Sequence, residues 1–279
     1  RLSDYAGEFV RWADIADQTP SALLQRPKLG DAAVEALVKS AHDAVHAHAQ
    51  ASAAGPVSAE EAVTALLNRL SDFDRVLLSG RRWTTPPVPT ATLTQELGVA
   101  AATLSRNLPR ADRRLGELLN DPLHRAVCEY ATRLADHLGP LVPDDLMAAT
   151  LRGMRVDPGG PTARFLLYLA GPYRPHQSGW IENASTGGHE HVRTALEDVF
   201  AQTPAPTLEV LRDQLGRAGM TEEAVWAFLR SQQRLRRFGD VCVKWNPGST
   251  ADMAEAVLSA MAEPMTSAAI HAGIGTDTV

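Results

Sequence analysis

Thr92–Asn107 reads TLTQELGVAAATLSRN, and it predicts two short helices joined by a turn at Gly98. Leu93, Leu97 and Leu104 recur at a spacing that packs the two helices together, and glycine permits a sharp reversal of the chain. This is the helix-turn-helix pattern. Its second helix keeps an outward polar face, and such a helix fits the major groove of DNA. We therefore expect bases to be read by Thr103, Ser105, Arg106 and Asn107.

The flanking residues extend this pattern over roughly residues 71 to 120. The matching residues are Val76-Leu77-Leu78, Arg81-Arg82-Trp83, Thr92-Leu93, Gly98-Val99, Leu104, Ala111 and Leu115. In this order and spacing the segment resembles the fourth region of bacterial sigma factors, in which a leucine-rich helix ends in Arg-aromatic and Thr-Leu opens the motif. The resemblance implies a bacterial DNA-binding protein that acts in transcription.

Pro109 departs from that family pattern, because it stands where the recognition helix should continue. A proline inside a helix removes a backbone donor and kinks or ends the helix. We expect base reading to stop at Leu108, and a separate helix to begin with Pro109 in its first turn.

The same segment is locally basic. Between Arg75 and Leu115 there are seven arginines against Glu96 and Asp112, within a chain of net charge -6. Phosphate binding needs a local field rather than a basic protein, so DNA remains a suitable partner. The alternative is a solvated face whose arginines satisfy neighbouring carboxylates. Phosphate contacts are predicted for Arg81, Arg82, Arg110, Arg113 and Arg114.

A second unit of similar kind is predicted further along the chain. Thr207–Leu215 is amphipathic, Thr221 caps another helix, and Leu235–Trp245 forms a hairpin around Gly239-Asp240. Two helices followed by a hairpin resemble a winged helix, a fold that binds DNA in some proteins and protein in others. Further phosphate contacts are predicted for Arg234, Arg236, Arg237 and Lys244.

The expected fold is mainly α: an array of helix-turn-helix and winged-helix units with a short β-hairpin wing. Asp157–Pro161 is rich in turn residues and marks the main predicted boundary. We predict an N-terminal helical segment (1–70), a sigma-like domain (71–156), a helical connector or degenerate repeat (161–203), a winged-helix unit (204–247) and the start of a truncated helix-turn-helix unit (248–279).

Other chemistry finds little support. His42 and His46 stand one helical turn apart without a third ligand, and His189-Glu190-His191 follows two glycines in a predicted loop. Cys128 and Cys242 are expected to be buried free thiols. Phosphate-binding loops and nucleophile motifs are missing, so we expect no enzyme, no cofactor and no metal. An enzyme with a metal at His189 and His191 ranks third among the hypotheses.

Composition and chain ends complete the expectation. No apolar run is long enough to span a membrane, and two cysteines suit a reducing cytoplasm. The chain begins without Met and stops within a repeated pattern, so we expect it to be part of a longer protein. The predicted function is double-stranded DNA binding, by a transcription regulator or the DNA-recognition arm of a larger defence or modification protein. The alternative is a protein-interaction scaffold of winged-helix units that binds, for example, RNA polymerase.

Overall fold

The computed structural model describes residues 19–25, 30–32, 34–35, 39–40, 57–177 and 179–275. This part of the chain is mainly helical with two small antiparallel sheets, which confirms the coarse fold class. Near the N-terminus, the Thr19 hydroxyl caps the short helix α2 (Pro20–Leu24) by accepting from the Ala22 amide. His42 and His46 lie outside the described residues.

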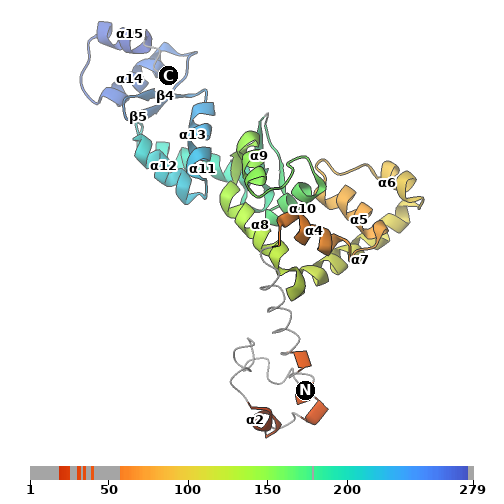
Figure 1. The fold of residues 1–279 in the computed structure, drawn as a ribbon. Helices are drawn as coiled ribbons and strands as arrows, with labels where there is room; N and C mark the ends of the chain where they lie inside the picture. Colours follow the sequence, from red (N-terminus) through yellow and green to blue (C-terminus); the bar gives the residue numbers. More distant parts are fainter. Residues whose placement is uncertain are drawn as a thin grey trace.

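The largest hydrophobic core joins helices that are far apart in the sequence (Figure 1). Val63, Leu134 and Phe165 are fully buried in this central core. Ser58 begins the first of its helices with a capping box that includes Glu61. The main helices that build it are α4 (Ala59–Leu67), α8 (Arg125–Leu138), α9 (Asp144–Gly153) and α10 (Pro161–Ala170), and a further helix described below adds Ala111 and Leu115. The 3-10 turn η3 (Pro122–His124) leads into α8 and has no buried residue.

Three helices form a smaller unit at one end of the molecule (Figure 1). Leu77, Leu93 and Leu104, one from each helix, make its core. The elements are α5 (Asp72–Leu78), the π-helical turn η2 (Ser79–Trp83), α6 (Thr90–Leu97) and α7 (Ala101–Leu119).

A three-stranded antiparallel sheet lies between two cores. Its strands are β1 (Leu141–Pro143), β2 (Tyr173–Pro175) and β3 (Trp180–Asn183), in the order β1-β3-β2. Val142 and Ile181 are opposite each other and belong to the central core, whereas Leu141 and Trp180 belong to a second core. Successive strand residues point to opposite faces, so the sheet is shared by both cores.

The second core and a small C-terminal core follow. Phe228 and Cys242 are buried in the second core, and Phe238 and Val257 in the C-terminal one. The elements are η4 (Ala184–Thr186), α11 (Gly188–Gln202), α12 (Leu208–Arg217), α13 (Glu222–Ser231), β4 (Leu235–Phe238), β5 (Val241–Lys244), α14 (Thr250–Met261) and α15 (Ser267–Gly275).

The central core crosses the predicted domain boundaries. Helices α9 and α10, on either side of Asp157–Pro161, both pack against α8, and α4 packs there too instead of belonging to a separate segment 1–70. The loop is a tight turn in which the Asp157 side chain accepts from the Gly159 amide. Its Gly and Pro residues therefore mark a change of chain direction. The predicted connector 161–203 is likewise divided, because α10 joins the central core and α11 the second core.

Candidate nucleic-acid interface

The turn between α6 and α7 is built as the sequence predicts. Gly98 ends α6 with a φ of +65°, a left-handed conformation that favours glycine. Leu93 and Leu104 are buried beside Leu77, and Leu97 packs against this cluster. The predicted contact between the two helices is confirmed, and it leaves the other side of α7 at the surface.

Helix α7 continues through Pro109 as one element from Ala101 to Leu119. The predicted helix end and the separate helix after it are therefore wrong. Pro109 is exposed, so its missing N–H removes one hydrogen bond on the side that water reaches. Ala111 and Leu115 on the opposite side are buried in the central core, and this packing stabilises the helix across the proline.

The four predicted base-reading residues lie in the first half of α7 but differ in environment. Ser105 and Arg106 are exposed, whereas Thr103 and Asn107 are half-buried. The side-chain amide of Asn107 donates to the Thr103 carbonyl, 2.9 Å away. This bond holds Asn107 against its own helix, so Arg106 is the best placed of the four to reach a ligand.

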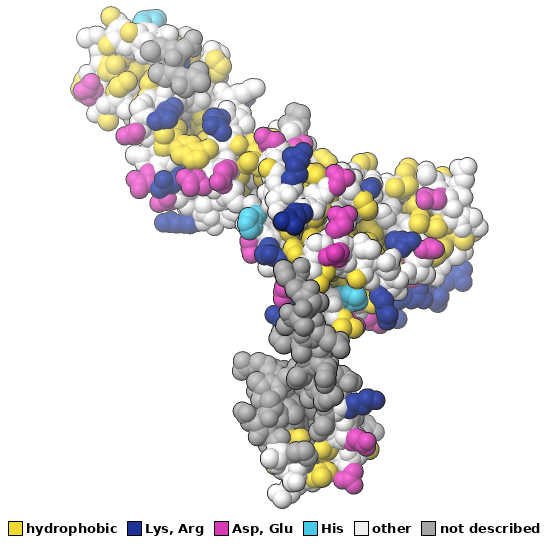
Figure 2. Space-filling model, in the orientation of Figure 1, with side chains coloured by type: hydrophobic (Ala, Val, Ile, Leu, Met, Phe, Trp, Pro, Cys, Tyr) yellow, Lys and Arg dark blue, Asp and Glu magenta, His cyan; other side chains and the backbone are white. Residues whose placement is uncertain are grey.

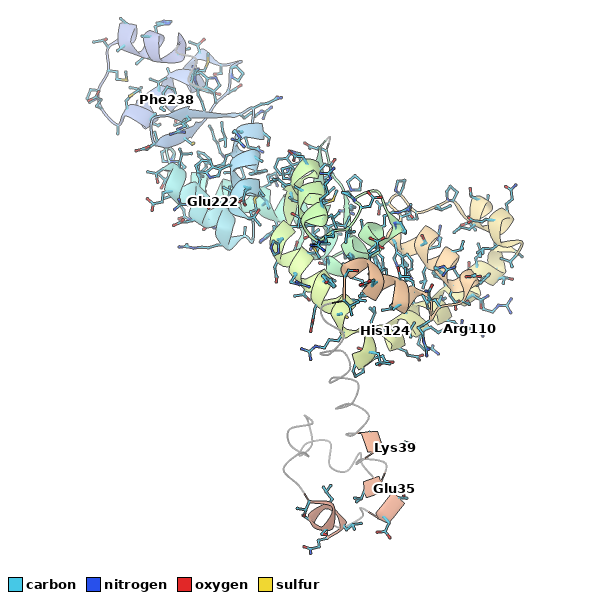
Figure 3. The ribbon with its side chains drawn as sticks, viewed as in Figure 1. Glu35, Lys39, Arg110, His124, Glu222 and Phe238 are labelled. Carbon is cyan, nitrogen blue, oxygen red and sulfur yellow. The ribbon has the colours of Figure 1, made fainter. Side chains whose placement is uncertain are left out.

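Three exposed arginines form a row along α7, named here the arginine ridge: Arg106, Arg110 and Arg113. Spacings of four and three residues place them on one helix face, over about 10 Å of helix axis. None of their guanidinium groups has a hydrogen-bond or ion-pair partner among the described residues. Basic side chains gather along the edge where α7 runs (Figure 2), and Arg110 projects there (Figure 3).

Two other arginines of this segment are bound inside the unit. Arg114 pairs with Asp74 of α5, a carboxylate whose side chain is 4% exposed. Arg82 makes a bidentate contact with Asp112, at 3.1 and 2.6 Å, and this hydrogen bonding raises the pKa of Arg82. Asp74 and Asp112 lie on opposite flanks of the ridge, because Arg114 and Asp112 stand on different sides of the α7 cylinder. The two ion pairs therefore fix the helix from both sides.

Arg81 is engaged as well, since its guanidinium donates to the Val88 carbonyl at 3.2 Å. Arg81, Arg82 and Arg114 were expected to contact phosphates, and the structure assigns their side chains to contacts within the unit. Of the five predicted phosphate contacts in this segment, Arg110 and Arg113 remain unpaired among the described residues.

Basic residues of the β4–β5 hairpin are also engaged within the chain. Arg236 lies 4.2 Å from the centroid of the Trp245 ring and donates to the Ile274 carbonyl at 3.1 Å. Lys244 pairs with Glu197 of α11. These contacts tie the hairpin to α11 and to the C-terminal helices.

The remaining two hairpin cations differ from each other. Arg237 donates to the Gly239 carbonyl at 2.6 Å. Arg234 is exposed, and its guanidinium has no hydrogen-bond or ion-pair partner within the described part of the chain. The predicted cluster of phosphate contacts on the hairpin is thus reduced to a single unengaged side chain.

A polar cluster that the sequence analysis missed lies between β3 and α11. Glu182 is 8% exposed, and its carboxylate accepts from Arg174 at 2.8 Å and from the His189 amide at 3.0 Å. The rings of His176 and His189 stack with centroids 4.3 Å apart. Strand pairing explains the cluster, because the β2–β3 register places Arg174 opposite Glu182.

The cluster shifts two pKa values. Burial opposes ionisation of Glu182, but the hydrogen bonds from His189 and Arg174 outweigh it, and the pKa of Glu182 is lowered. Burial and the nearby His176 lower the pKa of His189. His189 lies in the first turn of α11 and not in the loop that the sequence predicted.

Among the described residues, no group of three or more His, Cys, Asp or Glu side chains is arranged to hold a metal ion. No helix in that part of the chain has both the length and the apolar character needed to cross a membrane. No family model, curated protein or solved structure matches the chain.

Proposed function

We propose that this chain binds double-stranded DNA through α7, with α5, α6 and α7 acting as a helix-turn-helix unit. The supporting observation is the arginine ridge, a row of exposed guanidinium groups without partners among the described residues. An α-helix fits the major groove, and the phosphates on both sides attract unpaired cations. The resemblance of residues 71–120 to the fourth region of sigma factors supports the same role for α7.

The residues of α7 take different roles in this proposal. Of the three ridge arginines, Arg106 lies nearest the N-terminus of α7, the part of a recognition helix that meets base edges. Ser105, which precedes it, provides a second polar side chain for base contacts. Arg110 and Arg113 lie one and two turns further along and contact phosphates. A guanidinium is suited to both tasks, because its planar donors bind guanine or phosphate in pairs.

The flanking ion pairs strengthen the proposal. Arg82–Asp112 and Arg114–Asp74 hold α7 in place before any ligand arrives. A pre-ordered helix loses less conformational entropy on binding than a helix that must fold at the interface. Arg82 and Arg114 therefore act as positioning residues for α7.

Fluorescence anisotropy of a labelled duplex at about 50 and about 200 mM salt tests the proposal. The variant Arg106→Gln/Arg110→Gln/Arg113→Gln should lose affinity on the order of 100-fold at the lower salt, and the log–log salt slope should fall by about 1.8, because two of the three residues contact phosphates. The matched control, Arg217→Gln/Arg230→Gln/Arg234→Gln, removes the same charge from exposed sites in the second half. If both variants lose the same affinity for the duplex, binding depends on general charge attraction and not on a site at the arginine ridge.

A second function, protein interaction, is favoured for α12, α13 and the hairpin, which we propose form a winged-helix unit. Its hairpin cations are engaged within the chain, apart from Arg234 among the described residues. The exposed side of α13 begins with Glu222 and Glu223, which repel phosphates. A protein partner, for which RNA polymerase is the example suggested by the sigma-like segment, fits this surface better than DNA. The chain would then join a duplex to another protein.

A further inference from the structure

Two adjoining hollows lie along the face that α12 and α13 form together. One has a volume of about 470 Å³ and is bordered by Gly216, Met220 and Val225, among others. The other, of about 380 Å³, is bordered by Leu208 and Trp226. Arg212 borders both hollows, and the two together are named here the α12–α13 groove.

The groove is open, and apolar residues line it beside charged ones. Trp226 is half-buried, and its side chain has no ring contact or hydrogen bond with any described residue. A Cβ built at Gly216 meets nothing within 4 Å, so this helical glycine leaves free space. Glycine inside a helix is less stable than alanine, and no close packing in the fold requires it here. The groove thus has room for apolar side chains from outside.

The edges of the groove are acidic. Glu222 and Asp240 border the two hollows, and neither carboxylate has a partner among the described residues. Arg212 between the hollows is paired with Asp213 at 3.4 Å, so Arg217 is the one unpaired cation among the described lining residues. Acidic side chains gather beside hydrophobic ones over α12 and α13 (Figure 2), and Glu222 lies there (Figure 3).

These features select the kind of occupant. Unpaired carboxylates repel a phosphate backbone, which disfavours nucleic acid. Apolar side chains that fill the hollows gain from burial, and Lys or Arg side chains beside them meet the carboxylates at the edge. Grooves between helices commonly receive an amphipathic helix from another protein.

We propose that the α12–α13 groove docks a basic, amphipathic helical segment of a partner protein. This inference rests on the second proposed function and specifies the chemistry of its partner. Apolar residues of the segment sit over Gly216 and against Trp226, and its basic residues pair with Glu222 and Asp240.

The test uses the full chain and two synthetic helical peptides with the same leucine positions. One carries Lys and the other Glu at all polar positions, and binding is measured by isothermal titration. The Lys peptide should bind at least about tenfold more tightly than the Glu peptide. Equal affinity for the two, or no binding of the Lys peptide, would overturn the proposal.

Variants locate the site. Gly216→Leu fills the first hollow and should reduce affinity for the Lys peptide about tenfold or more. Gly216→Ala should keep most of the wild-type affinity. Both substitutions should raise the melting temperature, because they remove a glycine from a helix. Glu222→Gln/Asp240→Asn should weaken binding, and Glu255→Gln/Glu263→Gln, with the same loss of charge on exposed residues elsewhere, should not. Wild-type affinity of Gly216→Leu would place the peptide elsewhere and refute the groove.

A duplex titration with the same variants separates this inference from the DNA proposal. Gly216→Leu should bind the duplex as the wild type does, because the arginine ridge lies on α7. If peptide binding fails while duplex binding depends on the ridge, the groove proposal alone is lost. If the duplex is not bound while the Lys peptide is, the DNA proposal alone is lost.

Discussion

The α5–α7 unit and the unit of α12, α13 and the β4–β5 hairpin both place cations after a pair of helices, but the cations have different surroundings. In the first unit, Asp74 and Asp112 bind the flanking arginines, and the arginine ridge stays unpaired among the described residues. In the second, Arg236 and Lys244 are held by other parts of the chain. The number of basic residues in a segment therefore does not decide whether it offers a phosphate site; the positions of nearby acceptors do.

The largest expected effect concerns Arg114, which distinguishes a positioning residue from a phosphate contact. Arg114→Gln leaves the Asp74 carboxylate buried without its cation. Unpaired buried charge is costly, so the free energy of unfolding should fall by about 3 kcal/mol. Arg113 is the neighbouring residue in the sequence and belongs to the arginine ridge. Arg113→Gln should change the free energy of unfolding by less than about 0.5 kcal/mol. Urea unfolding of both variants measures the difference.

The opposite outcome would change the comparison. If Arg114→Gln unfolds like the wild type but binds a duplex with a reduced salt slope, Arg114 belongs to the phosphate-binding surface. The arginine ridge would then extend around α7 to Arg114. Arg114 would pair with Asp74 in the free chain and with a phosphate in the complex.

A somewhat smaller effect separates Arg106 from Asn107. Arg106→Ala should weaken binding to a selected duplex by about 2 kcal/mol and binding to random DNA much less, because bidentate contacts with a base specify sequence. Asn107→Ala should have less effect on the selected duplex, since its amide is already bonded to the Thr103 carbonyl. Anisotropy titrations on both duplexes provide the measurement. A larger loss for Asn107 would mean that this bond opens on DNA.

Much of the local structure could be predicted from the sequence. Gly98 predicts the turn after α6, Gly239-Asp240 predicts the hairpin, and the leucine spacing predicts which sides are buried. These features depend on neighbouring residues and on the conformational freedom of glycine. Pro109 shows the limit of such local rules, because packing of the opposite side of α7 outweighs its cost.

The candidate site could be predicted only in part. The position of Arg106, Arg110 and Arg113 on one face follows from helical periodicity. The partners of Arg114 and Lys244 do not, because Asp74 and Glu197 are 40 and 47 residues away in the sequence. The same holds for the domain boundary at Asp157–Pro161: a turn-rich loop gives no sign that α9 and α10 share one core.

Acid should act on the second core more than on the ridge. The pKa of His189 is lowered in the folded chain, mainly by burial, with Glu182, Glu190, His176 and Arg193 as its charged or titratable neighbours. The unfolded chain therefore binds the proton more readily, and stability should decrease as the pH falls from the ordinary value of 6.5 through the lowered pKa. Urea unfolding at about pH 7 and about pH 5.5 should show a smaller pH effect in His189→Gln than in the wild type.

The smallest expected effect concerns Lys244, whose substitution matches that of Arg114. Lys244 and Glu197 have side chains that are 56% and 48% exposed, so water solvates either partner when the pair is broken. Lys244→Gln should lower the free energy of unfolding by less than about 1 kcal/mol, and it should leave duplex affinity and salt slope unchanged. Urea unfolding and anisotropy give both values for the same preparation. A clear loss of duplex affinity would show that Lys244 leaves Glu197 to bind phosphate. The hairpin would then be part of the surface that binds DNA. Both units would bind DNA and would differ in affinity, not in function.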